Sequence, residues 1–224
     1  PPDFDTKAYL LADKLFPKAH LILNDYNCFY HHFEEEDSAL YRQVERILKA
    51  GGRIDGIGMQ YHLFMKKEEL EKFADTNLNA RYNLYMLSIY ERLNRDIHVS
   101  EITVPSYEST SELLEAQAAV VENLYRLWFS VKNVKSIVWW NFIDGYAYAR
   151  PDWDENYYGG GLLMKDFTAK PAYHVLDRLI HKEWHSEKKA VTDQWGRITF
   201  DGFFGDYEIK IKKGGDEEVR QYRH

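Results

Sequence analysis

The stretch Ile54-Asp55-Gly56-Ile57-Gly58-Met59-Gln60-Tyr61-His62 decides the fold, because it is a mostly apolar run that ends on polar side chains. Three further stretches have the same form: 21–27 (LILNDYN), 97–101 (IHVSE) and 136–144 (SIVWWNFID). Buried parallel strands read as short apolar runs, and α/β barrels place their chemistry where such strands end. These stretches therefore predict parallel strands whose polar ends meet at one face.

Helical patterns alternate with these strands. Ser38 is placed to cap a helix that Gly51-Gly52 would stop, and Pro171 suits the first turn of another. The helices that we expect lie over 1–19, 39–50, 82–93, 111–129 and from Lys170 onward. Strands and helices that alternate at this period indicate parallel βα units.

The number of βα units predicts an incomplete barrel. A closed barrel needs eight units and about 250 residues, and an open sheet of four would expose both edges. We expect half of a (β/α)8 TIM barrel over 1–183, a β-hairpin extension over 184–213 and a polar, frayed tail over 214–224. The hairpin is predicted from 197–200 and 207–211, which alternate apolar and polar residues and are joined through Gly202 and Gly205.

Composition excludes several classes of function. The net charge of −7 disfavours nucleic acid as a partner, and no apolar run reaches the 18 or so residues of a membrane span. Cys28 is the only cysteine, and the histidines lack metal-ligand spacing, so we expect no metal and no cofactor. The chain starts Pro1-Pro2 without a methionine, which suggests a processed or truncated piece.

Glu101, His62 and Gln60 are the strand-end residues that suit cleavage of a saccharide. Retaining glycosidases need a carboxylate nucleophile, kept ionised by hydrogen-bond donors, and a carboxylic acid about 5 Å away. His62 could donate to Glu101, and Gln60 lies on the same face of its strand as His62. Taken singly, Glu101 reads more readily as a surface carboxylate at the end of a strand, and His62 could simply be a satisfied core histidine.

Aromatic residues make up 16% of the chain and gather after the fourth strand. Trp139 and Trp140 are adjacent, so they should face opposite sides of a strand, with one of them at the barrel mouth. The loop that follows contains Tyr146, Tyr148, Trp153, Tyr157 and Tyr158. These side chains either pack the loop or form a wall on which sugar rings stack, and the sequence leaves both interpretations open.

At these motifs the chain resembles family 10 of the glycoside hydrolases, the endo-1,4-β-xylanases. The matching segments are Asn24-Asp25-Tyr26-Asn27, the run from Gly56 to His62, Val99-Ser100-Glu101, Trp140 with Asp144, and Lys170-Pro171-Ala172-Tyr173. The resemblance implies strands five to eight of the barrel. It also implies that Glu101 is the nucleophile, oriented by His62, with Gln60 and Trp140 on the glycone side and Tyr26 and Asn27 on the aglycone side.

Two departures from the family pattern concern the site. Thr103 stands where the family has an aspartate bonded to the histidine, and Tyr148 stands where a second tryptophan binds substrate. The family's acid/base glutamate, in a W-x-V-x-N-E segment, has no counterpart in this sequence. The resemblance thus implies part of a retaining endo-1,4-β-xylanase that is inactive by itself.

A non-catalytic module that binds xylan or associates with itself is the alternative. The expected partners are xylan or xylo-oligosaccharides, together with a missing N-terminal half-barrel or a second copy of the chain. For the parent protein we expect secretion or a place on the cell surface.

Overall fold

The computed structural model describes residues 3–26, 28–29, 38–70 and 76–223. The chain divides into two compact units, Pro1–Val175 and Leu176–His224. None of the described helices is long and apolar enough to cross a membrane.

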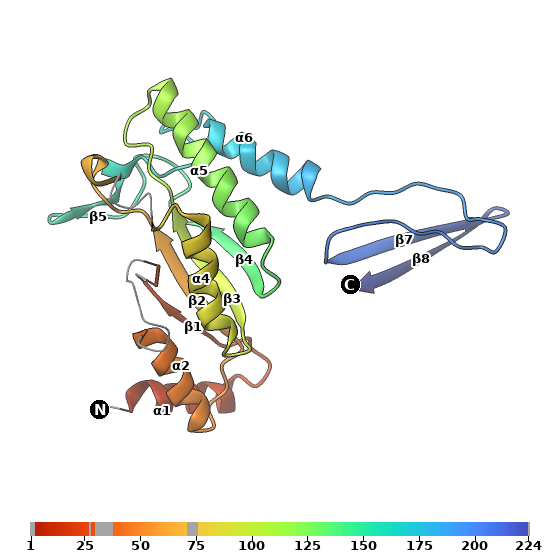
Figure 1. Cartoon of the computed structure of the whole chain (residues 1–224), viewed down its shortest axis with the longest axis horizontal. Helices are drawn as coiled ribbons and strands as arrows, with labels where there is room; N and C mark the ends of the chain where they lie inside the picture. Colours follow the sequence, from red (N-terminus) through yellow and green to blue (C-terminus); the bar gives the residue numbers. More distant parts are fainter. Residues whose placement is uncertain (1–2, 27, 30–37, 71–75, 224) are drawn as a thin grey trace. The chain divides into compact units, whose positions relative to one another are not determined.

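A parallel sheet in the order β1-β2-β3-β4 is the centre of the first unit (Figure 1). Each strand pairs with the next one along the chain, as expected of successive βα units. The four stretches identified from the sequence therefore do form strands, and their bounds are β1 (Ile22–Asp25), β2 (Gly56–His62), β3 (Asp96–Thr103) and β4 (Val134–Trp139).

The helices between the strands begin at polar caps. Ser38 accepts a hydrogen bond from the backbone N–H of Tyr41, and Asn79 and Thr110 cap their helices in the same way. All the predicted helices are confirmed, with ends that differ by a few residues: α1 (Phe4–Leu15), α2 (Ala39–Lys49), α4 (Ala80–Glu91), α5 (Ser111–Phe129) and α6 (Pro171–Arg178). The described part of this unit also contains short elements: η2 (Lys67–Glu69), β5 (Ala149–Arg150), β6 (Trp153–Asp154) and η3 (Glu155–Tyr158).

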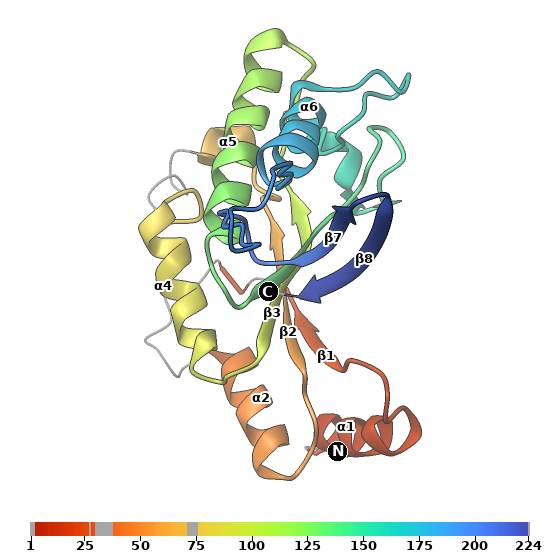
Figure 2. The same cartoon turned by 90° about the vertical axis from the view of Figure 1, so that its right-hand side faces the viewer.

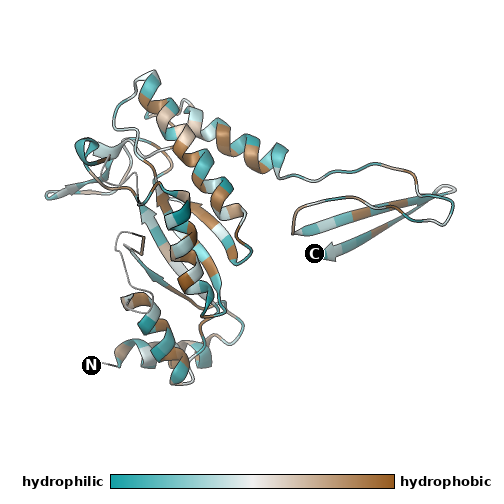
Figure 3. Cartoon of the chain, in the orientation of Figure 1, coloured by the Kyte–Doolittle hydropathy of each residue, from teal (hydrophilic) through white to brown (hydrophobic). Residues whose placement is uncertain are grey.

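Helices α4 and α5 cover one face of the sheet (Figure 2). Both alternate hydrophobic and hydrophilic residues along their length (Figure 3), and their apolar residues are buried against the strands. On β2, Ile57, Met59 and Tyr61 are buried on this side, and the Tyr61 ring contacts Phe29 and Trp128 at centroid distances of 4.9 Å each. Because side chains alternate along a strand, the other side of β2 is left for Gly58, Gln60 and His62.

The second unit contains a two-stranded antiparallel hairpin, but not the predicted one. It pairs β7 (Asp206–Lys213) with β8 (Asp216–Arg223) through the two-residue turn Gly214-Gly215. Both glycines have positive φ, of 60° and 108°, as this tight turn requires. The prediction was wrong twice: 197–200 is not a strand, and the supposed frayed tail forms β8. The π-helical turn Leu179–Glu183 also lies in this unit.

Candidate active site

A pocket of about 460 Å³ opens at the carboxyl ends of β2, β3 and β4. This volume is within the usual range for a small-molecule site. Carboxylate, amide, imidazole and aromatic groups line it: Tyr26, Gln60, His62, Phe64, Glu101, Trp140, Trp153 and Glu155. The structure therefore brings together five of the predicted site residues, namely Glu101, His62, Gln60, Trp140 and Tyr26.

An irregularity in β3 turns Glu101 toward the pocket. Met59 pairs with Val99, but the next residue of β2, Gln60, pairs with Glu101, so Ser100 has no partner in the register. Such a bulge places two successive side chains on the same face of a strand. Val99 remains buried, whereas Ser100 and Glu101 are both partly exposed, and Ser100 donates a hydrogen bond to Asn24.

Both oxygens of the Glu101 carboxylate have partners on β2. Gln60 Nε2 donates to Glu101 Oε1 at 2.8 Å, and His62 Nε2 lies 3.3 Å from Glu101 Oε2. Burial raises the pKa of Glu101 above its ordinary value; a hydrogen bond from Asn24 lowers it, and the nearby Glu155 carboxylate adds to the increase. The Gln60 donor on one side and the His62 ring on the other therefore hold the carboxylate in a single orientation.

His62 is a neutral donor to this carboxylate. Burial lowers the pKa of His62 to about 4, although the charge of Glu155 opposes that change. Its Nδ1 lies 3.0 Å from the Thr103 hydroxyl. Since a carboxylate only accepts, we assign the proton to Nε2, facing Glu101, and the Thr103 hydroxyl then donates to Nδ1. A neutral hydroxyl therefore holds the His62 ring at Nδ1 without adding a charge.

The neutral state of His62 predicts a loss of stability in acid. Its folded pKa lies below the unfolded value, so its contribution is fully present above about pH 6.5 and is lost as pH falls toward 4. We expect the free energy of unfolding to fall by about 3 kcal/mol over this window on account of His62. Denaturant unfolding at several pH values measures it.

Two variants make this pH test specific. His62→Asn should flatten the pH dependence, whereas His181→Asn, at a histidine that is 70% exposed, should leave it unchanged. Equal slopes for wild type and His62→Asn would show that His62 is not held neutral.

Aromatic rings form the rest of the pocket wall. Phe64 stacks on His62 with centroids 4.6 Å apart and planes 8° apart, and Trp140 meets His62 edge-on at 5.9 Å. Trp153 meets Phe64 edge-on at 5.5 Å. Tyr26 is 65% exposed at the rim. Flat rings around polar groups suit ligands with apolar faces and hydroxyl edges, which is the chemistry of sugars.

Two predicted residues are not part of this described pocket. The residues that line it do not include Tyr148, whose side chain is 53% exposed. Asn27 lies outside the described residues. The binding roles of both stay predictions.

Sequence reasoning missed Phe64 and Glu155, and it identified Trp153 only as one of several loop aromatics. Phe64 comes two residues after His62 and beyond the end of β2, so no strand pattern marks it. Glu155 lies in a polar loop with other carboxylates nearby, and only the fold brings it beside Glu101.

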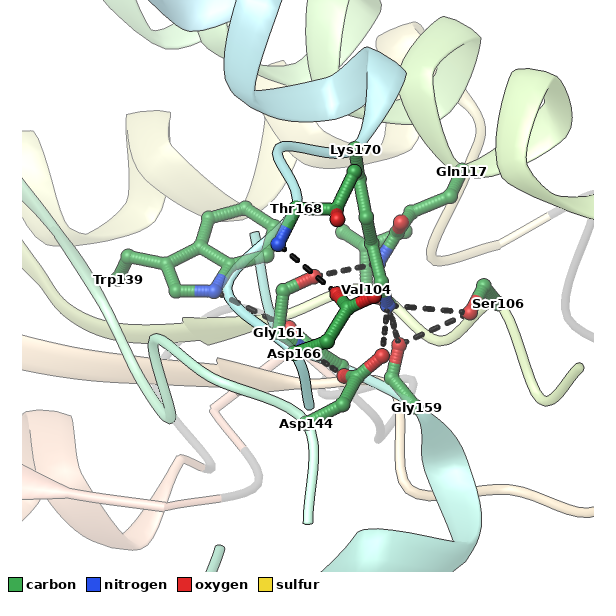
Figure 4. A network of polar contacts seen from close by, with 11 residues as sticks. Val104, Ser106, Gln117, Trp139, Asp144, Gly159, Gly161, Asp166, Thr168 and Lys170 are labelled. Atoms are coloured by element: carbon green, nitrogen blue, oxygen red, sulfur yellow. Dashed lines mark hydrogen bonds and ion pairs between the residues drawn. The ribbon is translucent and has the colours of Figure 1, made fainter. Parts of the chain in front are cut away.

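A buried ion pair between Lys170 and Asp144 stabilises the loop that packs against the site (Figure 4). The Lys170 side chain is 0% exposed, and its Nζ lies 2.6 Å from Asp144 Oδ2 and donates to Gly159 O at 2.8 Å. Asp144 Oδ1 also accepts from Gly161 N–H at 2.8 Å. These contacts hold the loop 159–161 in place.

The loop 159–161 in turn lies against Thr103. A Cβ on Gly160 would come within 2.5 Å of Thr103 Cγ2, so this position has no room for a side chain. Trp139 Nε1 donates to Gly160 O at 3.1 Å, whereas the next residue, Trp140, donates through its Nε1 to Glu155 Oε2. The packing therefore fixes Thr103, which orients His62.

Comparison with known proteins gives a consistent answer. Residues 2–178 match the model of glycosyl hydrolase family 10. Endo-1,4-beta-xylanase B of Thermotoga neapolitana is 24% identical over 184 residues, which cover 81% of this chain and 49% of that protein. Endo-1,4-beta-xylanase A of the same organism is 28% identical over 193 residues, or 78% of this chain and 16% of that protein.

Solved structures agree with the sequence comparison. The crystal structure of native xylanase 10B from Thermotoga maritima aligns with a TM-score of 0.62 and 25% identity, covering 81% of this chain and 53% of that one. This chain thus spans about half the length of the first relative and of this structure. The fold is part of a TIM-barrel-like α/β fold, and the chain belongs to glycosyl hydrolase family 10.

Proposed function

We propose that the pocket binds the β-1,4-linked xylose chain of xylan and that Glu101 is the nucleophile of a retaining xylanase site. The observation that carries this proposal is the contact set of Glu101 inside an aromatic-walled pocket: Gln60 Nε2 donates to one oxygen of its carboxylate, and His62 Nε2 lies 3.3 Å from the other. The relatives named endo-1,4-beta-xylanase support the substrate class.

The proposed chemistry starts at Glu101. Its carboxylate oxygen attacks the anomeric carbon, the bond to the leaving sugar oxygen breaks, and a glycosyl ester forms; water then hydrolyses the ester. The donors on Gln60 and His62 orient the carboxylate before attack. Gln60 is also placed to reach a sugar hydroxyl, where a hydrogen bond that tightens in the transition state would raise the rate. Tyr26 and Trp140 form the wall on which rings stack.

The proton for the leaving oxygen is not assigned to a residue of this chain. In our proposal, β1 to β4 correspond to strands five to eight of the barrel, and the acid/base belongs to a segment with the preceding strands. That segment, or a second copy of the chain, would complete the barrel next to β1 and β4. A polypeptide of residues 1–224 then binds xylan and hardly cleaves it.

Binding without turnover is the second candidate function. The exposed aromatic residues Tyr26 and Trp140 beside Gln60 favour it, because they serve recognition whether or not a proton donor is present. The two candidates share the pocket and differ only in whether Glu101 forms a covalent bond with the sugar.

Titration calorimetry with xylohexaose tests the shared pocket. We expect Trp140→Ala to weaken binding about tenfold or more. A stacked ring contributes on the order of 1 kcal/mol of binding free energy in addition to the free energy from burying its apolar surface. Trp195→Ala, at a tryptophan that is 72% exposed in the second unit, is the matched control and should bind as wild type does. Unchanged binding by Trp140→Ala would place the sugar elsewhere.

A further inference from the structure

Glu155 is a buried carboxylate at the edge of the pocket. Its residue is 8% exposed and opens the short helix η3, and its backbone N–H donates to Tyr148 O at 3.0 Å. Its side chain lines the same pocket as Glu101. Neither the reaction proposed for Glu101 nor its contacts with Gln60 and His62 assigns Glu155 a part.

Three side-chain N–H groups converge on this carboxylate. Trp140 Nε1 and Asn141 Nδ2 donate to Glu155 Oε2 at 2.9 and 2.5 Å, and Trp153 Nε1 donates to Glu155 Oε1 at 3.4 Å. Asn141 has a left-handed backbone, with φ of +66°, a conformation that asparagine tolerates better than most residues. This turn at the end of β4 lets two successive side chains reach the same carboxylate oxygen.

An indole has a single N–H, so one strong acceptor is enough to fix the direction of its ring. Trp140 directly follows β4 and Trp153 lies in β6, yet both donate to Glu155. Trp140 then meets His62 edge-on, and Trp153 meets Phe64 edge-on at 5.5 Å. One carboxylate therefore sets the orientation of both tryptophans in the pocket wall.

The same carboxylate adds negative charge to the pocket. The groups that face it are Glu101, His62 and Tyr158, and its charge contributes to raising the pKa of Glu101 and of Tyr158 and opposes the fall in that of His62. In each of these cases burial is the larger cause. A change at Glu155 should therefore also be visible in the titration of Glu101.

We propose that Glu155 is a positioning residue, which holds the indoles of Trp140 and Trp153 in the orientation that receives a sugar ring. The part that concerns the sugar depends on the proposed function. The orientation of the two indoles does not, so the two claims can fail separately.

Glu155→Gln is the first test, because it keeps the size of the side chain, removes the charge and replaces one acceptor by a donor. In a nitrogen-15 NMR spectrum, the indole N–H signals of Trp140 and Trp153 should shift, and their hydrogens should exchange faster. The Trp139 indole, which donates to Gly160 O, is an internal control that should stay in place. Asp154→Asn is the matched variant, since this neighbouring carboxylate contacts Asn156 instead.

Wild-type protein supplies a second measurement if Glu155→Gln does not fold. The Trp140 indole hydrogen should exchange more slowly than that of Trp195, although the Trp140 side chain is itself 37% exposed. Equal exchange of the two, or unmoved Trp140 and Trp153 signals in Glu155→Gln, would overturn the positioning role.

Binding of xylohexaose tests the part of the proposal that depends on the proposed function. Xylohexaose should bind Glu155→Gln about tenfold more weakly, in line with the contribution of a stacked ring, and Asp154→Asn should bind as wild type does. The pKa of Glu101, followed by carbon-13 NMR, should fall in Glu155→Gln. Shifted indoles in a protein whose wild type does not bind xylohexaose would reject the proposed function and retain the positioning role.

Discussion

Asp144→Ala is expected to destabilise the protein by about 3–5 kcal/mol, because it leaves the ammonium of Lys170 buried without its carboxylate. Burial already lowers the pKa of Lys170, and the hydrogen bond and charge of Asp144 oppose that change. Without Asp144, the charged lysine would keep hydrogen bonds to Gly159 O and Ser106 Oγ but no neutralising partner. Denaturant unfolding measures the loss.

A surface ion pair provides the control for this experiment. Arg150 and Asp152 are 3.0 Å apart, with side chains 55% and 74% exposed. Asp152→Ala should change the free energy of unfolding by about 1 kcal/mol or less, as exposed pairs usually do. Equal effects of the two substitutions would mean that the Lys170–Asp144 pair does not hold the loop behind Thr103.

The second large effect concerns turnover by a polypeptide of residues 1–224. We expect negligible cleavage of xylan but measurable cleavage of dinitrophenyl β-xylobioside, because dinitrophenolate leaves without being protonated. General acid catalysis raises the rate about a hundredfold to ten-thousandfold. Its absence should therefore slow cleavage only of substrates whose leaving group must be protonated, such as xylan. Glu101→Gln should abolish release of dinitrophenolate, and Glu108→Gln, at a side chain that is 58% exposed, should not.

Adding a polypeptide that supplies the barrel half with the acid/base should restore cleavage of xylan, again only with Glu101 present. Rapid cleavage of xylan by residues 1–224 alone, abolished by Glu101→Gln, would show that the chain contains its own acid and would refute this part of the proposal.

The sequence predicted the elements of the first unit well, because each has a local cause. Ser38 and Pro171 mark helix starts, and the apolar run that contains Ile57 and Met59 and ends on Gln60 and His62 marks β2. The contact between Gln60 and Glu101 was harder to predict from the sequence. Simple alternation from Ile97 would bury Glu101 with Val99, and only the bulge at Ser100 turns it into the pocket. A register shift depends on the neighbouring strand, so one strand's sequence does not reveal it.

Contacts between distant residues were the other limit. Asp144 and Lys170 were each identified as parts of motifs, but their ion pair joins segments that only the fold brings together. Glu155 has no local pattern at all. In the second unit, the polar composition of β8 concealed a strand that Gly214-Gly215 could have indicated, since paired glycines suit a two-residue hairpin turn.

Covalent trapping tests the central claim, that Glu101 is the nucleophile of a sugar site, most directly. The reagent is dinitrophenyl fluoroxylobioside, in which fluorine replaces the hydroxyl beside the anomeric carbon and slows hydrolysis of the glycosyl ester. We predict that mass spectrometry finds one fluoroxylobiosyl group per chain, located by peptide mapping on Glu101 and absent from Glu101→Gln. A label on any other residue, or wild-type protein that binds xylohexaose and is never labelled, would contradict the assignment.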